Sequence, residues 1–202
     1  MRHSLIFSAL LGAGLLAAAG ASLLAAAPPK VQFSDTRLAN GLREDVVARA
    51  QRNPRFLKQM ADNALRNRPP AGRGIVDSLF GEGGTARVDL KMHGTVPFVD
   101  AARIWALAAG LHETNTAERL LRLSEAGRLP HDDVRAWVPS FEYFQLMRLR
   151  AQHRRAQSYA GAADNPNEVA LGDLSALDRR IINEAFRQAR KVQQRLELDY
   201  PG

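Results

Sequence analysis

Cysteine is absent from the 202 residues of this chain. Its absence excludes disulfide scaffolds, zinc ribbons, thiol nucleophiles and cysteine-ligated clusters, but it leaves the cellular compartment open. Aromatic residues make up only 6% of the chain, so a core must be built mainly from leucine, alanine, isoleucine and valine. Hydrophobic residues reach 46% and charged residues 24%, which excludes wholesale disorder. The length suits one domain, or one domain with an appendage.

Lysine is scarce, being confined to Lys30, Lys58, Lys91 and Lys191, and arginine supplies the remaining positive charge. Basic residues number 28 and acidic residues 21, which gives a net charge of +7. One explanation is a GC-rich genome that favours arginine and alanine codons. The other is an anion-binding face, because guanidinium groups pair well with phosphate and carboxylate. Net charge alone does not decide between nucleic acid, nucleotide and acidic protein as the partner.

The chain also lacks the common short motifs of catalysis. It has no G-x-S-x-G motif, and the glycine segments 72–74 and 81–84 are too short for a phosphate-binding or dinucleotide-binding loop. No two histidines are three or four residues apart, so a helical metal pair is excluded; they are His3, His93, His112, His131 and His153. We therefore predict no catalytic residue and no metal site.

Residues 4–29 carry no ionisable side chain. A basic start at Arg2, an apolar middle and small residues before Pro28 are typical of a secretory signal, and the stretch is long enough to span a bilayer. We interpret residues 1–29 as a signal-like or membrane-anchor segment that forms a hydrophobic N-terminal helix. The alternatives are an alanine- and leucine-rich helix buried in a soluble protein, or a start codon placed upstream of the true one.

After this segment the patterning predicts an all-α fold, a bundle of five or six helices. Ser34 or Asp35 is expected to cap the first helix, and the second begins at Asn53-Pro54 and ends near Arg68. On the first helix, the apolar stripe expected to face the protein core consists of Leu38, Leu42, Val46 and Ala50. Residues 69–84 are rich in glycine and proline and predict a loop.

The second half of the chain carries further cap and breaker signals. A short extended segment at 85–92 precedes a helix from Pro97 to Gly110, and the next helix is capped around Asn115 and ends before Gly127. A long buried helix is expected from His131 to about Tyr159, kinked or split by Pro139. The predicted remainder is a loop at 161–172 and a last helix opened by a Ser175/Asp178 capping box.

Two clusters of charged residues are candidates for binding. The first combines Asp89 and Lys91 with Asp100 and Arg103; the second, on the long helix, consists of Arg148, Arg150, His153, Arg154 and Arg155. One interpretation is a solvated surface whose long aliphatic stems cover apolar neighbours. The other is that Arg148 and Arg150 lie in a mostly buried stretch and need partners, which Asp89, Asp100, Glu142 or a bound anion would supply.

Several short stretches carry a family resemblance across residues 31–200. They are Asn53-Pro54-Arg55-Phe56-Leu57, Asp89-Leu90-Lys91, Val99-Asp100, Glu118-Arg119-Leu120, Arg148-Leu149-Arg150 and Pro166-Asn167. In order and spacing they resemble the linker and C-terminal substrate-binding domain of bacterial nucleotidyltransferases related to protein-PII uridylyltransferase, which often carry CBS or cyclic-nucleotide-binding modules. The resemblance implies linker helices at 30–84 and a helical substrate-binding domain at 85–202.

Catalysis in that family uses a G-S motif and a D-x-D pair that holds metal and nucleotide, and this chain has neither. Residues 33–37 resemble a stretch near the end of the family's catalytic domain. The resemblance therefore implies the helical half of a two-domain enzyme, without the catalytic half. It implies no cofactor in this chain, because Mg²⁺ and nucleotide would belong to the catalytic domain.

The leading hypothesis is a non-catalytic substrate-binding or regulatory domain for an acidic or nucleotide-bearing partner. The candidate contacts are Lys91, Arg103, Asn115, Arg119, Arg148 and Arg150. Lys91 and the arginines would clamp an anion, and Asn115 would act as a ligand donor or as a helix cap. The expected partner is a nucleotidyltransferase catalytic domain or an acidic protein, and no nucleic acid is expected.

Two other hypotheses stay open. One is an exported or membrane-anchored helical interaction protein, which residues 4–29 would bring to the membrane. The other is the remnant of a truncated nucleotidyltransferase gene. The family resemblance indicates the cytoplasm, whereas the N-terminal segment indicates a membrane or the periplasm.

Overall fold

The computed structural model describes residues 36–70, 87–157 and 165–201. The predicted N-terminal hydrophobic helix, with its signal or membrane role, and almost all of the predicted loop at 69–84 lie outside these residues. Among the helices in the described part, none combines the length and the apolar character that crossing a membrane requires. A compact unit begins at Ala39 and includes the described residues that follow.

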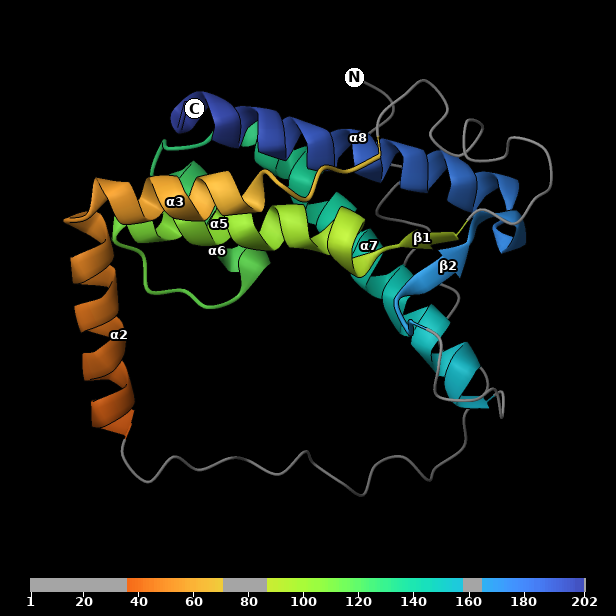
Figure 1. Cartoon of the computed structure of the whole chain (residues 1–202), viewed down its shortest axis with the longest axis horizontal. Helices are drawn as coiled ribbons and strands as arrows, with labels where there is room; N and C mark the ends of the chain where they lie inside the picture. The colour runs from red at the N-terminus through yellow and green to blue at the C-terminus, as the bar shows by residue number, and fades with distance from the viewer. Residues whose placement is uncertain (1–35, 71–86, 158–164, 202) are drawn as a thin grey trace. The chain divides into compact units, whose positions relative to one another are not determined.

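Helices dominate the described residues, as Figure 1 shows. The α-helices are α2 (Thr36–Gln51), α3 (Pro54–Ala64), α5 (Val96–Ala109), α6 (Thr116–Glu125), α7 (His131–Gln157) and α8 (Ala176–Asp199). Two short strands, β1 (Arg87–Asp89) and β2 (Glu168–Ala170), pair antiparallel with Val88 opposite Val169. The predicted helical class is confirmed, and so is the extended segment predicted at 85–92 over Arg87–Asp89; Lys91 and Met92 lie in a π-helical turn instead. The loop predicted at 161–172 is wrong from Glu168 onward, because β2 and then the 3₁₀ turn Leu171–Asp173 lie there.

The predicted caps at Asn53, Gly110 and Ser175 are confirmed, because each depends on neighbouring residues alone. The cap predicted at Ser34 or Asp35 lies outside the described residues. The Asn53 side chain accepts the N–H of Phe56 at 3.0 Å, with Pro54 in the first turn. Ser175 and Asp178 form the expected capping box, in which the Ser175 oxygen accepts the Asp178 N–H at 3.1 Å. Gly110, at a φ of 76°, ends α5 in the left-handed conformation that glycine favours.

The core lies where α5, α7 and α8 meet, and aromatic rings from the three helices hold it together. Phe98, Phe144 and Phe186 are fully buried. The Phe144 ring centroid is 4.9 Å from that of Phe186 and 6.4 Å from that of Phe98, distances at which aromatic pairs attract. Beside them, Trp105 and Trp137 stack with 5.7 Å between centroids.

The long helix α7 is central, as predicted, and it is not split at Pro139. Proline removes one backbone hydrogen bond from a helix. Pro139 itself is exposed to solvent, whereas Trp137 and Ser140 on either side are buried. Packing against α6 and α8 therefore keeps the helix continuous despite that loss.

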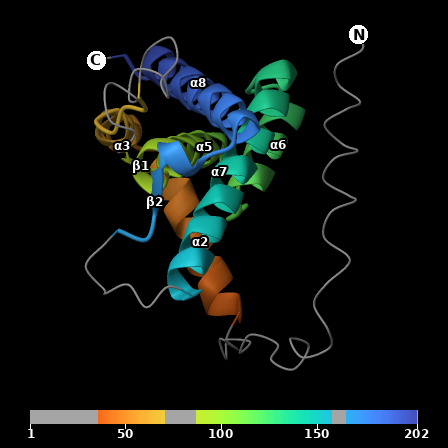
Figure 2. The same cartoon turned by 90° about the vertical axis from the view of Figure 1, so that its right-hand side faces the viewer.

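A π-helical turn, Lys91–Thr95, joins β1 to α5 and rests on α7. Figure 2 shows the strand pair in front of the end of α5, with α7 and α8 on either side. Gly94 makes the close approach possible, because a Cβ atom there would come within 2.7 Å of the Phe144 ring. Phe144 has no room to retreat, since its side chain is fully enclosed.

The predicted core-facing stripe of α2 is wrong in part. Leu38 is 75% exposed and Leu42 64%, and Val46 is exposed as well; Ala50 alone of the stripe is buried, and Val47 is buried beside it. Hydrophobic spacing identifies an apolar face but not the face that finds a partner. On α8 the core-facing residues include Ile182, Ala185 and Leu196, whereas Leu177 is exposed.

The second helix, α3, ends at Ala64 rather than near Arg68, and α8 supplies the reason. The Gln193 side chain donates to the backbone oxygens of Ala64, at 3.2 Å, and Asn67, at 2.8 Å. The Arg190 guanidinium donates to the Pro70 oxygen. These side chains hold the carbonyl groups at the end of α3 that a continuing helix would have used itself.

Replacing Gly94 with alanine should destabilise the fold by about 1–3 kcal/mol, the usual cost of overpacking a full core. Gly41 in α2 is the matched control, because a Cβ atom there would meet nothing within 4 Å. Gly41→Ala should be neutral or slightly stabilising. Urea denaturation measures the free energy of unfolding of both variants. Equal values for the two would contradict the close contact between Gly94 and Phe144.

Candidate functional site

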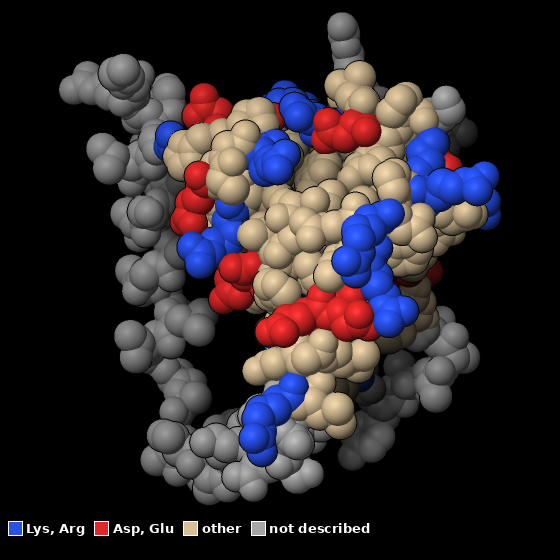
Figure 3. All heavy atoms as spheres, turned by 90° about the vertical axis from the view of Figure 1, so that its left-hand side faces the viewer, with Lys and Arg blue, Asp and Glu red and all other residues tan. Residues whose placement is uncertain are grey.

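The structure divides the six candidate residues into three groups. Figure 3 shows that basic and acidic side chains are interspersed over the face it displays, so charge alone marks no site there. What distinguishes one arginine from another is whether its guanidinium is already engaged by other groups.

The first group lies at the strand pair, within a network that we call the polar clasp: Asp89, Thr95, Arg148, Asn165 and Asn167. One Asp89 carboxylate oxygen accepts the N–H groups of Lys91, at 2.8 Å, and Met92, at 2.9 Å. The other accepts the Asn165 amide. Burial pushes the pKa of Asp89 up, but the hydrogen bonds from Met92, Asn165 and Lys91 outweigh it and hold that pKa below its usual range.

Arg148 on α7 completes the polar clasp, and most of its N–H groups already form hydrogen bonds there. Its Nε donates to Asn167 Oδ1 at 3.1 Å, and its Nη1 donates to Gln145 Oε1 at 2.7 Å and more weakly to Thr95 Oγ1 at 3.4 Å. The partners that the structure gives it are neutral, whereas carboxylates or an anion were expected. Arg148 thus ties α7 to the strand pair.

Lys91 takes part in the polar clasp through its backbone, while its side chain is exposed at the first position of the π-helical turn. Within the described residues the Lys91 ammonium has no ion-pair partner. A π-helical turn is often found at functional sites, so Lys91 stays a candidate for an anion contact beside the polar clasp.

The second group brings Arg103 of α5 close to Arg119 of α6, and we call these two the arginine pair. Arg119 Nε donates to the backbone oxygen of Glu113 at 2.7 Å. Burial lowers the pKa of Arg119, and the positive charge of Arg103 lowers it further. Two like charges therefore lie near each other on a partly buried surface, an arrangement that costs free energy without a counter-ion.

The neighbouring carboxylates do not fully neutralise the arginine pair. Asp100 approaches Arg103 only to 3.5 Å, and burial raises the pKa of Asp100 although Arg103 opposes this. The Glu113 carboxylate is engaged by Arg122, whose Nε lies 3.1 Å from Glu113 Oε1. The Glu113 charge still raises the pKa of Arg119, but less than burial and Arg103 lower it, because the carboxylate hydrogen-bonds Arg122 instead.

Asn115 is the N-cap of α6. Its side-chain oxygen accepts the N–H groups of Ala117, at 2.9 Å, and Glu118, at 3.2 Å. Of the two roles considered for Asn115, that of helix cap is therefore confirmed. Its oxygen is occupied by that role, so the ligand-donor role would fall to its amide nitrogen.

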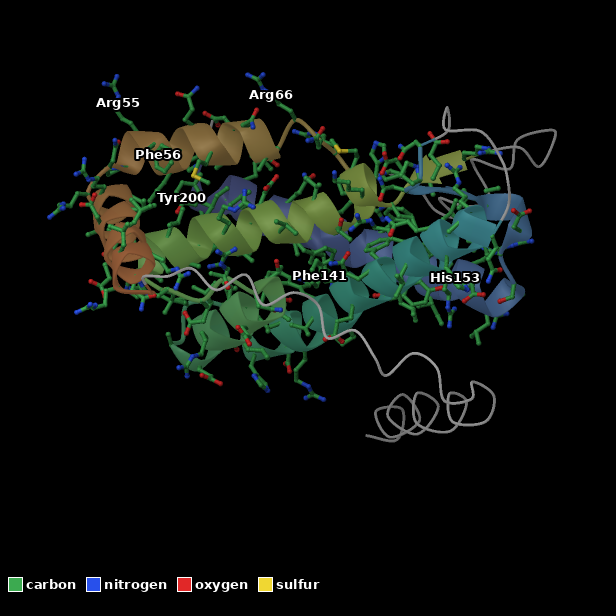
Figure 4. The ribbon with its side chains drawn as sticks, turned by 90° about the horizontal axis from the view of Figure 1, so that it is seen from below. Arg55, Phe56, Arg66, Phe141, His153 and Tyr200 are labelled. Atoms are coloured by element: carbon green, nitrogen blue, oxygen red, sulfur yellow. The ribbon has the colours of Figure 1, made fainter. Side chains whose placement is uncertain are left out.

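Arg150 stands apart as the third group. Its side chain is exposed on α7 and approaches only the Met147 sulfur, at 4.0 Å. Its positive charge reaches Tyr143, whose pKa is nevertheless raised by burial and by Asp178. Figure 4 labels His153 near the C-terminal end of α7, and there it lies 3.0 Å from the Gln157 amide. Arg150 and His153 form no common site in the part of the chain described.

Sequence reasoning missed the two asparagines that flank Pro166. Asn165 links Asp89 to Asn167, and Asn167 links Asn165 to Arg148. An asparagine on each side of a proline is a turn signal, but nothing in the chain order shows that this turn faces Asp89. Among residues 36–70, 87–157 and 165–201, no group of three or more histidine, aspartate or glutamate side chains is placed to hold a metal.

Comparison with known proteins gives one match. The sequence model of the family described as "Putative nucleotidyltransferase substrate binding domain" matches residues 54–200. The matched segment begins at the first residue of α3 and runs to the end of α8. No curated protein and no solved structure matches the chain.

Replacing Asp89 with asparagine should cost about 1–3 kcal/mol at neutral pH, because it removes a charged acceptor and sets two amide groups against each other. The folded-state pKa of Asp89 is lowered, so the stability it contributes is present above the usual aspartate value of about 4 and is lost as the pH falls through the folded value. The difference between wild type and variant should shrink on acidification. The exposed Asp173, changed to asparagine, is the control for urea denaturation between pH 7 and pH 3. A difference that stays constant over that range would contradict the polar clasp.

Proposed function

The chain belongs to the family of nucleotidyltransferase substrate binding domains, and we propose that it is a non-catalytic helical module that binds an acidic or nucleotide-bearing partner. The arginine pair is proposed as the principal contact. The observation that carries this proposal is the closeness of Arg103 and Arg119 without a carboxylate that engages both.

Burial and, after it, the charge of Arg103 lower the pKa of Arg119, and an anion at the arginine pair would offset both. Guanidinium groups bind carboxylate and phosphate through paired hydrogen bonds, and such charge-assisted bonds are among the strongest in proteins. Arg119 Nε is occupied by the Glu113 backbone, so its terminal nitrogens would meet the ligand. Arg103 is about half exposed, which leaves it accessible from solvent.

The proposed module would act together with a separate catalytic domain. Nucleotide transfer uses carboxylates that hold Mg²⁺ against the substrate phosphates, and this sequence lacks the G-S and D-x-D motifs that the resemblance would require. The partner would thus be a nucleotidyltransferase catalytic domain or the acidic protein that such an enzyme modifies. The resemblance to enzymes related to protein-PII uridylyltransferase makes a PII-type protein the first acidic partner to test.

Changing Arg103 to glutamine should weaken binding of UTP, ATP or an acidic PII-type protein by about tenfold or more, the effect of losing one charge-assisted hydrogen bond. Folding stability should stay equal or rise, because the repulsion disappears and the glutamine amide can still donate to Asp100. Isothermal titration calorimetry measures the first effect and thermal unfolding the second.

Arg135→Gln is the matched control, because Arg135 is exposed on α7 and lies outside all three groups. It should bind as the wild type does. Binding that is equal in wild type and Arg103→Gln, or that is absent in the wild type for all three ligands, would refute the proposed function.

A further inference from the structure

A pocket of about 310 Å³ lies where α5 and α8 end and α6 passes into α7. No residue of the polar clasp or of the arginine pair lines it. Figure 3 looks at the end of the molecule where α5 and α8 finish, and Figure 4 labels Tyr200 just beyond α8, beside the C-terminal end of α5. The polar lining comes from Arg128, Arg195, Asp199 and Tyr200, and Trp105 and Leu123 contribute apolar surface.

The Asp199 carboxylate is a part of the pocket lining that neighbouring side chains hold in place. Arg195 Nε lies 3.1 Å from both Asp199 carboxylate oxygens, and the Trp105 indole N–H donates to Oδ2 at 3.0 Å. Trp105 is held in turn by its stack on the buried Trp137. The Asp199 charge is therefore already engaged, and the groups around it are held in place.

The polar groups of the lining that remain available are hydrogen-bond donors. Arg128 makes no side-chain hydrogen bond or ion pair with any described residue, and Arg195 uses only its Nε. The Tyr200 hydroxyl has no partner among the described residues either. Burial and the Asp199 charge raise the Tyr200 pKa, so this hydroxyl keeps its proton. A pocket whose unused groups are donors is suited to a ligand rich in acceptors.

Helix ends at the pocket would oppose an anion if their carbonyl groups were free, because the C-terminal end of a helix carries partial negative charge. The end of α6 is capped instead. After α6, Gly127 takes a φ of 65°, its N–H donates to the Ser124 oxygen, and the Arg128 N–H donates to the Leu123 oxygen at 2.8 Å. The same turn that caps α6 thus places Arg128 on the pocket.

We propose that this pocket binds a small organic anion, a phosphate monoester or a carboxylate, through Arg128, the terminal nitrogens of Arg195 and the Tyr200 hydroxyl. The volume is at the lower end of that of small-molecule sites, which favours a compact ligand with one anionic group. The apolar surface of Trp105 and Leu123 receives the rest of the ligand. The inference goes beyond the proposed function, because it uses different residues and a small molecule.

The two tryptophans of the chain are the stacked pair at this pocket, so tryptophan fluorescence reports on it directly. Full-length protein is titrated with phenyl phosphate, benzoate and the neutral benzyl alcohol. Phenyl phosphate, benzoate or both should change the fluorescence saturably, and benzyl alcohol should not. A preference for phenyl phosphate would identify the ligand as a phosphate ester, and a preference for benzoate would identify it as a carboxylate.

Arg128→Ala should weaken binding of the anionic probe by at least about tenfold. The fold should be unaffected, because this side chain has no partner among the described residues to lose. Arg135→Ala is the matched control and should bind as the wild type does. Arg103→Gln should also bind the probe normally, which separates this inference from the proposed function. No saturable change with either anion, or an equal response in wild type and Arg128→Ala, would overturn the proposal.

Discussion

The contact between Gly94 and the Phe144 ring is the constraint on which the arrangement of the other elements depends. The π-helical turn can lie on α7 only because residue 94 has no side chain, and Phe144 cannot move because it packs against Phe98 and Phe186. This contact fixes the position of α5 relative to α7 and α8. It also places Asp89 where the polar clasp forms and orients α5, and therefore Arg103, toward α6.

The many arginines of the chain have different tasks, and their partners distinguish them. Arg148 donates hydrogen bonds to neutral groups of the polar clasp. Arg122 forms an ion pair with Glu113, and Arg195 forms one with Asp199. Arg148 joins α7 to the strand pair, whereas Arg122 and Arg195 pair with carboxylates beside or within their own helices. Arg103, Arg119 and Arg128 are different, because the described residues leave their charge only partly compensated. Codon bias, one of the two explanations for the number of arginines, does not explain this division.

What could be predicted from the sequence was local. The caps at Asn53, Asn115 and Ser175 follow from hydrogen bonds within one turn, so the residue types alone indicate them. The partner of a side chain is set by the fold, and there prediction failed. The apolar stripe with Leu42 on α2 does not face the core, and Arg148 bonds to Asn167 rather than to a carboxylate. The closeness of Arg103 and Arg119, which lie on different helices, had no signal in their spacing.

The central claim is that Arg103 and Arg119 form an incompletely neutralised pair that binds an anion. Nitrogen-15 NMR of the arginine Nε–H groups during a titration of full-length protein with UTP tests it most directly. The account predicts that the resonances of Arg103 and Arg119 shift together and saturate at the same ligand concentration, while that of Arg148 stays in place within its clasp. Unchanged Arg103 and Arg119 resonances, or small unsaturable shifts spread over all exposed arginines, would contradict it.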